Sequence, residues 1–179
     1  MMSKDCMTTH VKLDAAAFRK FAIFDNLLLR RRWTRPIIFF LILTAFSVVC
    51  FLLKKEQSAL IGTVLFLVAV LMPLTYFGTF FYQIHTQIKT LKLKTPQAFY
   101  TLRFSPEGIQ IENDRKKEET QNLPWDKVYA VYRVAGFIYL YATPTRAFLL
   151  PDGQTDATPA EMWDLFERHI DKKRLFAKK

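Results

Sequence analysis

The sequence predicts a membrane helical hairpin joined to an α+β domain, in which an antiparallel sheet of about five to six strands is capped by a C-terminal amphipathic helix. Two uncharged apolar runs lie back to back in the first half of the chain, Pro36–Leu53 and Ser58–Tyr82. After Thr95 the pattern changes to the alternation of apolar and polar residues that is typical of strands. An amphipathic pattern of helical period follows at Met162–Ile170.

The two apolar runs are long enough to cross a bilayer. At a rise of ~1.5 Å per residue they extend about 27 Å and about 37 Å as helices, against a hydrocarbon core of ~30 Å. Only Lys54–Gln57 separates them, so the two helices are expected to be antiparallel neighbours. Neither run contains an ionisable Asp, Glu, Lys, Arg or His. This disfavours a transporter or a pump, because such proteins need ionisable groups within the membrane.

Basic residues flank the outer ends of both runs and predict the orientation. Seven cations adjoin these ends: Arg30, Arg31, Arg32, Arg35, Lys89, Lys92 and Lys94. Between the runs the sequence has only Lys54 and Lys55, beside Glu56. Positive residues near span ends stay in the cytoplasm. We therefore expect a multi-pass protein with both termini cytoplasmic and with the seven cations in contact with the membrane surface.

The segment before the first apolar run is expected to hold a short strand and a helix. The strand is placed at Thr8–Leu13, and Asp14 is a suitable N-cap for an amphipathic helix over Ala15–Leu29. This helix either lies on the membrane surface or packs on the soluble domain, and the sequence leaves both arrangements open. The predicted division of the chain is 1–35 for the strand and helix, 36–82 for the hairpin, 83–94 for a basic linker and 95–179 for the soluble domain.

The soluble domain begins with a β-hairpin. Tyr100–Phe104 and Ile109–Glu112 alternate on either side of the turn residues Ser105–Gly108. The charged stretch Asn113–Asn122 is expected to be a loop. Three further strands are predicted at Val128–Val134, Phe137–Ala142 and Arg146–Leu150.

The last predicted element is a helix with a strong start signal. Thr158 as N-cap, Pro159 at the first helical position and Glu161 at the third form a capping box. The apolar side of this helix covers Met162–Ile170. Its last turn is expected to be the basic Lys172–Arg174, which suits the negative end of the helix dipole.

The net charge of +10 does not predict a nucleic-acid-binding protein. Residues 1–94 hold 13 Lys or Arg against four Asp or Glu, whereas residues 95–179 hold 13 against 12. The basic excess therefore flanks the apolar runs, and the soluble domain is almost neutral. Binding to DNA or RNA would need the reverse distribution.

No motif in the sequence predicts catalysis, a metal or a cofactor. His10, His85 and His169 lie far apart, and none has metal-ligand spacing to Cys, Asp or Glu. Trp125, which precedes a predicted strand, is expected to pack in the core. One loop, Arg115, Lys116 and Lys117, is a candidate for gripping lipid headgroups, although the following Glu118 and Glu119 offset its charge and favour a solvated loop.

The order of the later motifs resembles the YcxB-like family of bacterial membrane proteins. The residues that carry this resemblance are Phe104 with Glu107-Gly108-Ile109, then Pro124-Trp125, then Leu150-Pro151. The resemblance implies two transmembrane helices, a cytoplasmic pleckstrin-homology-like (PH-like) domain and a location in the bacterial inner (cytoplasmic) membrane. It implies no enzymatic activity and no cofactor. Asp152 stands where a basic residue is expected, which argues against a phosphate site at this corner.

We therefore expect a membrane-anchored, non-enzymatic cytoplasmic module for interaction or scaffolding. Its partners would be the lipid bilayer and a protein bound at a sheet edge or in a groove beside Met162–Ile170. A homo-oligomer is left open, and no nucleic acid is expected. The first alternative is a sensor of anionic lipid or of a small ligand, and the second is an oligomeric pore-forming protein.

Overall fold

The protein combines two long apolar helices with two four-stranded sheets. The computed structural model describes residues 6–53, 56–114, 120–134 and 136–177. It divides into two compact units, and each is described by itself below. The sheet unit comprises Met1–Ala17 and Thr95–Lys179, and the helical unit comprises Phe18–Lys94.

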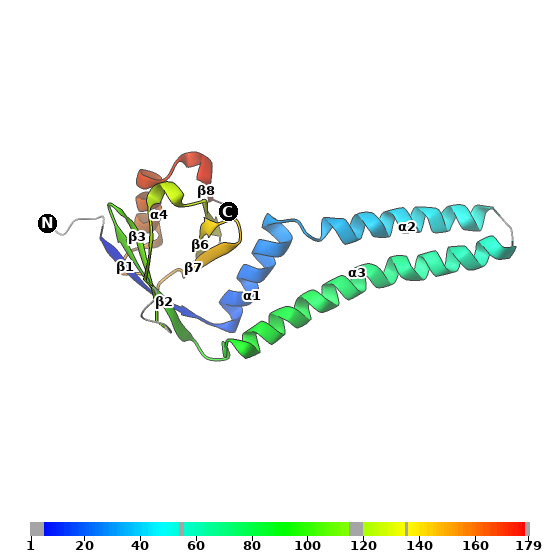
Figure 1. The fold of residues 1–179 in the computed structure, drawn as a ribbon, viewed down its shortest axis with the longest axis horizontal. Helices are drawn as coiled ribbons and strands as arrows, with labels where there is room; N and C mark the ends of the chain where they lie inside the picture. Colours follow the sequence, from blue (N-terminus) through cyan, green and yellow to red (C-terminus); the bar gives the residue numbers. More distant parts are fainter. Residues whose placement is uncertain (1–5, 54–55, 115–119, 135, 178–179) are drawn as a thin grey trace. The chain divides into compact units, whose positions relative to one another are not determined.

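Four helical segments follow one another between the first two strands (Figure 1). Their bounds are α1 Ala15–Ile23, the π-helix η1 Phe24–Leu29, α2 Thr34–Leu52 and α3 Glu56–Thr90. The Asp14 cap is confirmed, because the amide of Ala17 donates to Asp14 Oδ1 at 2.7 Å. The predicted single helix over Ala15–Leu29 is wrong in its second half, where the backbone widens into η1. π-Helical turns of this kind are rare and frequently occur at functional sites.

Helices α2 and α3 run side by side (Figure 1) and approach each other closely at Gly62. A Cβ atom at Gly62 would lie 3.2 Å from the ring of Phe51 and 3.3 Å from Cβ of Cys50. The hydroxyl of Ser47, which is 1% exposed, donates to the carbonyl of Gly62 at 2.7 Å. Because glycine has no side chain, the backbone of α3 comes near enough for this polar contact between the helices.

Helix α3 continues beyond the predicted end of the second apolar run. It ends at Thr90 rather than at Tyr82, so the first part of the predicted basic linker is helical. Ile84 and Ile88 in this extension are buried. The helix stops in a Schellman arrangement, in which the amide of Leu93 donates to the carbonyl of Ile88 at 3.0 Å and Lys92 adopts a φ of +54°.

The first sheet has the order β1-β2-β3-β4, and each pair of adjacent strands is antiparallel. Its strands are β1 Met7–Leu13, β2 Gln97–Ser105, β3 Gly108–Asn113 and β4 Thr120–Leu123. The predicted strand at Thr8–Leu13 and the predicted hairpin of β2 and β3 are confirmed. The predicted loop Asn113–Asn122 is wrong at its end, where β4 begins. Three of the four β4 side chains are exposed, so the strand has no apolar alternation that would reveal it.

The second sheet has the order β7-β6-β5-β8 and is mixed. Its strands are β5 Ala130–Val134, β6 Phe137–Thr143, β7 Arg146–Pro151 and β8 Leu175–Ala177, of which β8 pairs with β5 in parallel. The expected single antiparallel sheet of five to six strands is therefore replaced by two sheets of four. A short 3-10 turn, Trp125–Lys127, precedes β5 and shortens it from the predicted start at Val128.

Helix α4, Pro159–His169, begins with the predicted capping box and packs its apolar side in the core. Met162, Leu165 and Phe166 are at most 1% exposed, and the Phe166 ring contacts the Phe104 ring edge to face with centroids 5.8 Å apart. The partner groove expected beside Met162–Ile170 stays a prediction, although the side chains of Met162, Leu165 and Phe166 are themselves covered. The basic Lys172–Arg174 forms a separate 3-10 turn and not the last turn of the helix.

The hydroxyl of Tyr100 connects the two sheets. Tyr100 on β2 donates from Oη to the carbonyl of Leu149 on β7 at 3.0 Å, and it accepts from the amide of the same residue. The Tyr100 ring also contacts Phe148 edge to face, with centroids 5.2 Å apart. Burial raises the pKa of Tyr100 well above its ordinary value. The hydroxyl thus remains neutral and satisfies two backbone groups of β7.

Replacing this hydroxyl is expected to destabilise the sheet unit. Tyr100→Phe keeps the ring but leaves the amide and the carbonyl of Leu149 without that partner, at a cost of about 1–3 kcal/mol. Urea unfolding of the full-length protein in detergent micelles, followed by near-UV circular dichroism, measures this loss. Tyr129→Phe is the matched control, because Tyr129 is 52% exposed. Equal stabilities of the two variants would contradict the role assigned to Tyr100.

The stability of the sheet unit is also expected to depend on alkaline pH. Burial raises the pKa of Tyr139 to about 12 from the ordinary 10.0. The folded state therefore keeps a proton that the unfolded state releases, and the free energy of unfolding falls as pH rises from about 10 to about 12. Tyr139→Phe should make this fall less steep in urea unfolding measured across that range, with the contribution of Tyr100 remaining, whereas Tyr129→Phe should not change it. If the free energy of unfolding falls with pH as steeply in Tyr139→Phe as in the unmodified protein, the explanation is wrong.

Candidate functional site

A tight turn between η1 and α2 brings four arginines together. The amide of Arg30 donates to the carbonyl of Asp25 at 3.0 Å, and the amide of Arg32 donates to that of Asn26 at 3.1 Å. Arg31 adopts a φ of +46°, and its carbonyl accepts from the hydroxyl of Thr34 at 2.8 Å. A left-handed conformation costs about 1–2 kcal/mol in a residue other than glycine, and at Arg31 it changes the direction of the chain before α2 starts. Arg30, Arg31 and Arg32 consequently lie in this turn, and Arg35 follows in the first turn of α2.

One face of α3 lies opposite this turn. The α3 residues on this face are related by steps of three or four positions, which is the spacing of a single helix face. They are Met72, Thr75, Tyr76, Thr79, Phe80 and Gln83. The hydroxyls of Thr75 and Thr79 donate back to carbonyls of their own helix at 2.8–3.0 Å.

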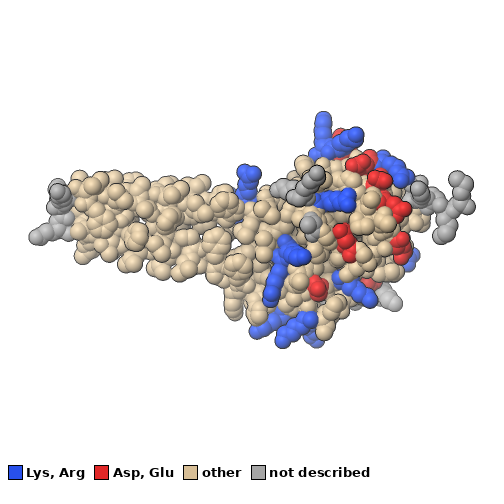
Figure 2. Space-filling view, turned by 180° about the vertical axis from the view of Figure 1, so that it is seen from behind, with Lys and Arg blue, Asp and Glu red and all other residues tan. Residues whose placement is uncertain are grey.

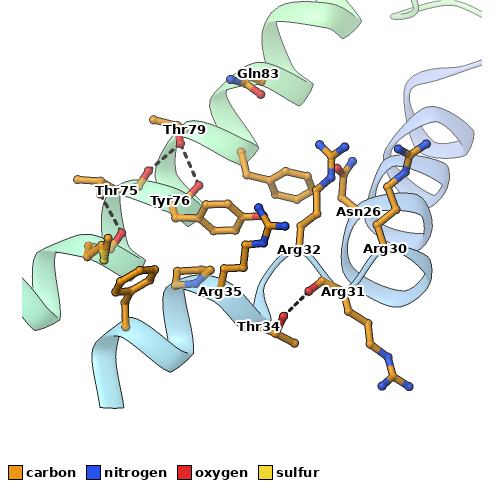
Figure 3. A pocket seen from close by; sticks show the side chains of 14 residues that line it. Asn26, Arg30, Arg31, Arg32, Thr34, Arg35, Thr75, Tyr76, Thr79 and Gln83 are labelled. Carbon is orange, nitrogen blue, oxygen red and sulfur yellow. Dashed lines mark hydrogen bonds between the residues drawn. The ribbon is translucent and has the colours of Figure 1, made fainter. Parts of the chain in front are cut away.

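The arginine turn, the start of α2 and this face of α3 enclose a pocket of about 1050 Å³. We call it the arginine pocket. From the first segments it is lined by Asn26, the four arginines, Thr34, Pro36 and Phe39. Figure 3 shows the side chains of Arg32 and Arg35 on the side of Tyr76 and Gln83, whereas Arg31 points away from them. Pro36, Phe39, Met72 and Phe80 form the apolar part of the wall.

The arginine pocket has an excess of positive charge. Asp25 pairs with Arg30, with Nε and Oδ2 2.9 Å apart. The only other acid between Phe18 and Lys94 is Glu56, at the opposite end of α3. In the described part of the helical unit, Arg31, Arg32 and Arg35 are exposed and have no carboxylate within ion-pair distance. Three guanidinium groups are therefore available to an anion.

The structure brings together some of the predicted surface cations and separates others. The four arginines line the pocket, whereas Lys89, Lys92 and Lys94 are exposed at and beyond the end of α3 and do not line it. The proposed headgroup loop, Arg115, Lys116 and Lys117, lies outside the described residues. Sequence reasoning missed Tyr76 and Gln83 as wall residues. Their helical spacing with Met72 and Thr79 was the available signal.

Two of the three histidines, His169 and His10, have structural contacts, whereas His85 is exposed on α3. The His169 ring stacks on Trp125 with centroids 4.7 Å apart, and Nδ1 of His10 is 3.0 Å from the hydroxyl of Thr101. Trp125 packs as predicted, since it is 8% exposed and its Nε1 donates to the carbonyl of Ser105 at 3.0 Å. Among the described residues there is no group of three or more His, Cys, Asp or Glu that could hold a metal ion.

Comparison with known proteins adds no functional information. No family model matches the chain, and the searches of curated proteins and of solved structures found no match. The resemblance to the YcxB-like family therefore rests on the sequence motifs alone. Any functional assignment depends on the geometry of the two units.

Proposed function

We propose that the protein is a membrane-anchored, non-enzymatic interaction or scaffolding module, in which α2 and α3 form a transmembrane hairpin. The observation that supports this most is the exposure of the two helices. Thr34–Leu52 and Gln57–Thr90 are long and apolar enough to cross a membrane. In the most apolar 18-residue stretch of each helix, only 11% of the residues are buried. Figure 2 shows this surface almost without Lys, Arg, Asp or Glu. Water tolerates such a continuous apolar surface poorly, whereas a bilayer covers it.

The charges at the two ends of this helix pair support a cytoplasmic location for both termini. The start of α2 and the end of α3 lie at the same end of the antiparallel pair, and seven cations adjoin this end. In the sequence, only Lys54 and Lys55, beside Glu56, stand between the two apolar runs. By the positive-inside rule the first end faces the cytoplasm. This agrees with the inner-membrane location that the YcxB-like resemblance implies.

The polar side chains of α2 and α3 support an anchor rather than a pore. A pore needs polar groups that face water in its lumen. Ser47, Thr63 and Thr75 instead donate to backbone carbonyls at 2.7–3.0 Å. No charged residue occurs in Pro36–Leu53 or Ser58–Tyr82.

In this proposal the sheet unit is a PH-like domain that binds a protein partner through a sheet edge. Strand β4 is an edge of the first sheet, and Thr120–Asn122 on it are exposed. An extended peptide can add to such an edge by main-chain hydrogen bonds. The apolar side of α4 is not offered to a partner, because it is buried in the core of the unit.

Cysteine labelling tests the proposed topology. Cys6, which is exposed, is expected to react with a membrane-impermeant maleimide only after spheroplasts are permeabilised. The labelled chain carries Cys50→Ser, so that Cys6 is the only thiol. The matched variant adds Cys6→Ser and Gln57→Cys, which moves the thiol to the start of α3, and should react in intact spheroplasts.

Two results would contradict this topology. Labelling of Cys6 in intact spheroplasts would place the N-terminal segment outside. Labelling of both positions only after permeabilisation would show that α2 and α3 do not cross the membrane.

The pore alternative is tested by leakage. Proteoliposomes that contain the full-length protein are expected to retain an entrapped fluorescent dye as well as protein-free vesicles do, since the spans offer no charged or water-facing lining. Dye release that increases with protein density would favour the oligomeric pore. Incorporation is verified by flotation of the vesicles in a density gradient.

A further inference from the structure

We propose that the arginine pocket binds the headgroup of an anionic phospholipid, with the lipid phosphate held by Arg32 and Arg35. This inference rests on the proposed function, because it requires α2 and α3 to lie in a bilayer. It assigns the lipid site to the helical unit rather than to the loop Arg115–Lys117.

The charge of the pocket fits a phosphate group. Guanidinium groups match phosphate oxygens with paired hydrogen bonds. Arg32 and Arg35 lie on the side of the turn that faces Tyr76 and Gln83 (Figure 3), so a phosphate between them also meets a phenol hydroxyl and a side-chain amide. The carboxylate of Asp25 is engaged with Arg30 at 2.9 Å and does not neutralise this pair.

The order of polar and apolar residues along the pocket fits a lipid better than a free phosphate ion. Arg32 lies in the turn before α2 and Arg35 in the first turn of α2, and the wall continues along the helices through Pro36, Phe39 and Met72. Phe39 is 51% exposed and Met72 is 40% exposed, so the apolar wall opens onto the apolar surface of the two helices. A headgroup between the arginines would therefore place its acyl chains along Phe39 and Met72. A free phosphate would use the charged part and leave the apolar part uncovered.

The position of the pocket agrees with the level at which headgroups lie. Basic pockets between transmembrane helices on the cytoplasmic side are suited to anionic headgroups. Trp33, in the same turn, is 37% exposed and donates from Nε1 to the carbonyl of Leu27 at 2.9 Å. Tryptophan favours the interface between hydrocarbon and water. The volume of about 1050 Å³ is slightly above the usual range of small-molecule sites, about 300–1,000 Å³, so the pocket is large enough for a ligand of that class.

Native mass spectrometry of the full-length protein in dodecyl maltoside tests the proposal. The delipidated protein is titrated with dioleoylphosphatidylglycerol and, separately, with dioleoylphosphatidylcholine. We expect one phosphatidylglycerol to bind per chain well before phosphatidylcholine binds. The double variant Arg32→Gln/Arg35→Gln should bind phosphatidylglycerol roughly 30-fold more weakly. Arg32→Lys/Arg35→Lys should retain an intermediate affinity, since it keeps the charge but loses the paired hydrogen bonds.

The matched control is Lys89→Gln/Lys94→Gln, which removes the same charge from exposed positions outside the pocket. This variant is expected to bind phosphatidylglycerol as the unmodified protein does. An equal loss in both glutamine variants would overturn the proposal in favour of diffuse attraction. Equal binding of phosphatidylcholine would also overturn it. If excess inorganic phosphate displaces the lipid, the proposal is overturned, and the ligand of the pocket is a free phosphate ion.

The failure of this inference is distinguishable from the failure of the proposed function. Membranes from cells that express each variant are extracted with alkaline carbonate. If the protein stays in the membrane pellet while the two glutamine variants bind lipid alike, only the headgroup site is wrong. If the unmodified protein is extracted, the proposed membrane anchor is wrong as well.

Discussion

The apolar surface of α2 and α3 is the constraint on which the rest of the protein depends. Leu41, Leu60 and Leu74 are 59–68% exposed, and comparable residues surround both helices. At ~25 cal/mol for each Å² of apolar surface, contact with water would destabilise this pair by far more than any single polar contact could offset. The two helices also bury little against each other. The proposed bilayer would cover this surface, and the charge distribution at the ends of the pair fits it.

The same constraint explains the turn between η1 and α2. Charged residues have to stop where an apolar helix begins, and the last charged residue before the apolar part of α2 is Arg35. The π-helical turn and the left-handed Arg31 gather the arginines beside α3 instead of spreading them along a longer linker. The guanidinium groups then lie next to an apolar wall that begins at Pro36. Charge and apolar surface are thus combined in one pocket, which is the basis for assigning it to an amphiphilic ligand.

The elements that could be predicted from the sequence are those with a strong local signal. Long uncharged runs predict α2 and α3, the sequence Thr158–Glu161 predicts the start of α4, and alternation predicts the hairpin of β2 and β3. The elements that escaped prediction depend on distant contacts. Strand β8 has three residues and forms only against β5. Strand β1 was predicted, but its pairing with β2, more than 80 residues later, was not.

The candidate site was predictable only in part for the same reason. The arginines are adjacent in sequence, so their cluster was expected as a membrane-surface contact. The pocket needs the pairing of α2 with α3, which places Tyr76 and Gln83 beside residues some 45 positions earlier. Sequence periodicity along α3 indicates a face but not what lies opposite it. The end of α3 at Thr90 was also missed, because Ile84 and Ile88 extend the helix after the uniformly apolar residues stop.

The central claim, that α2 and α3 lie in a hydrocarbon environment, is tested most directly by spin labels along α3. Single cysteines at Leu60, Leu67 and Leu74, in a Cys6→Ser/Cys50→Ser background, carry the labels in lipid bilayers. Collision rates with molecular oxygen and with a water-soluble nickel chelate then report the medium at each exposed position. If α2 and α3 lie in hydrocarbon, collisions with oxygen are frequent and collisions with the chelate are rare at Leu67 and Leu74. Frequent collisions with the chelate at these positions would contradict it.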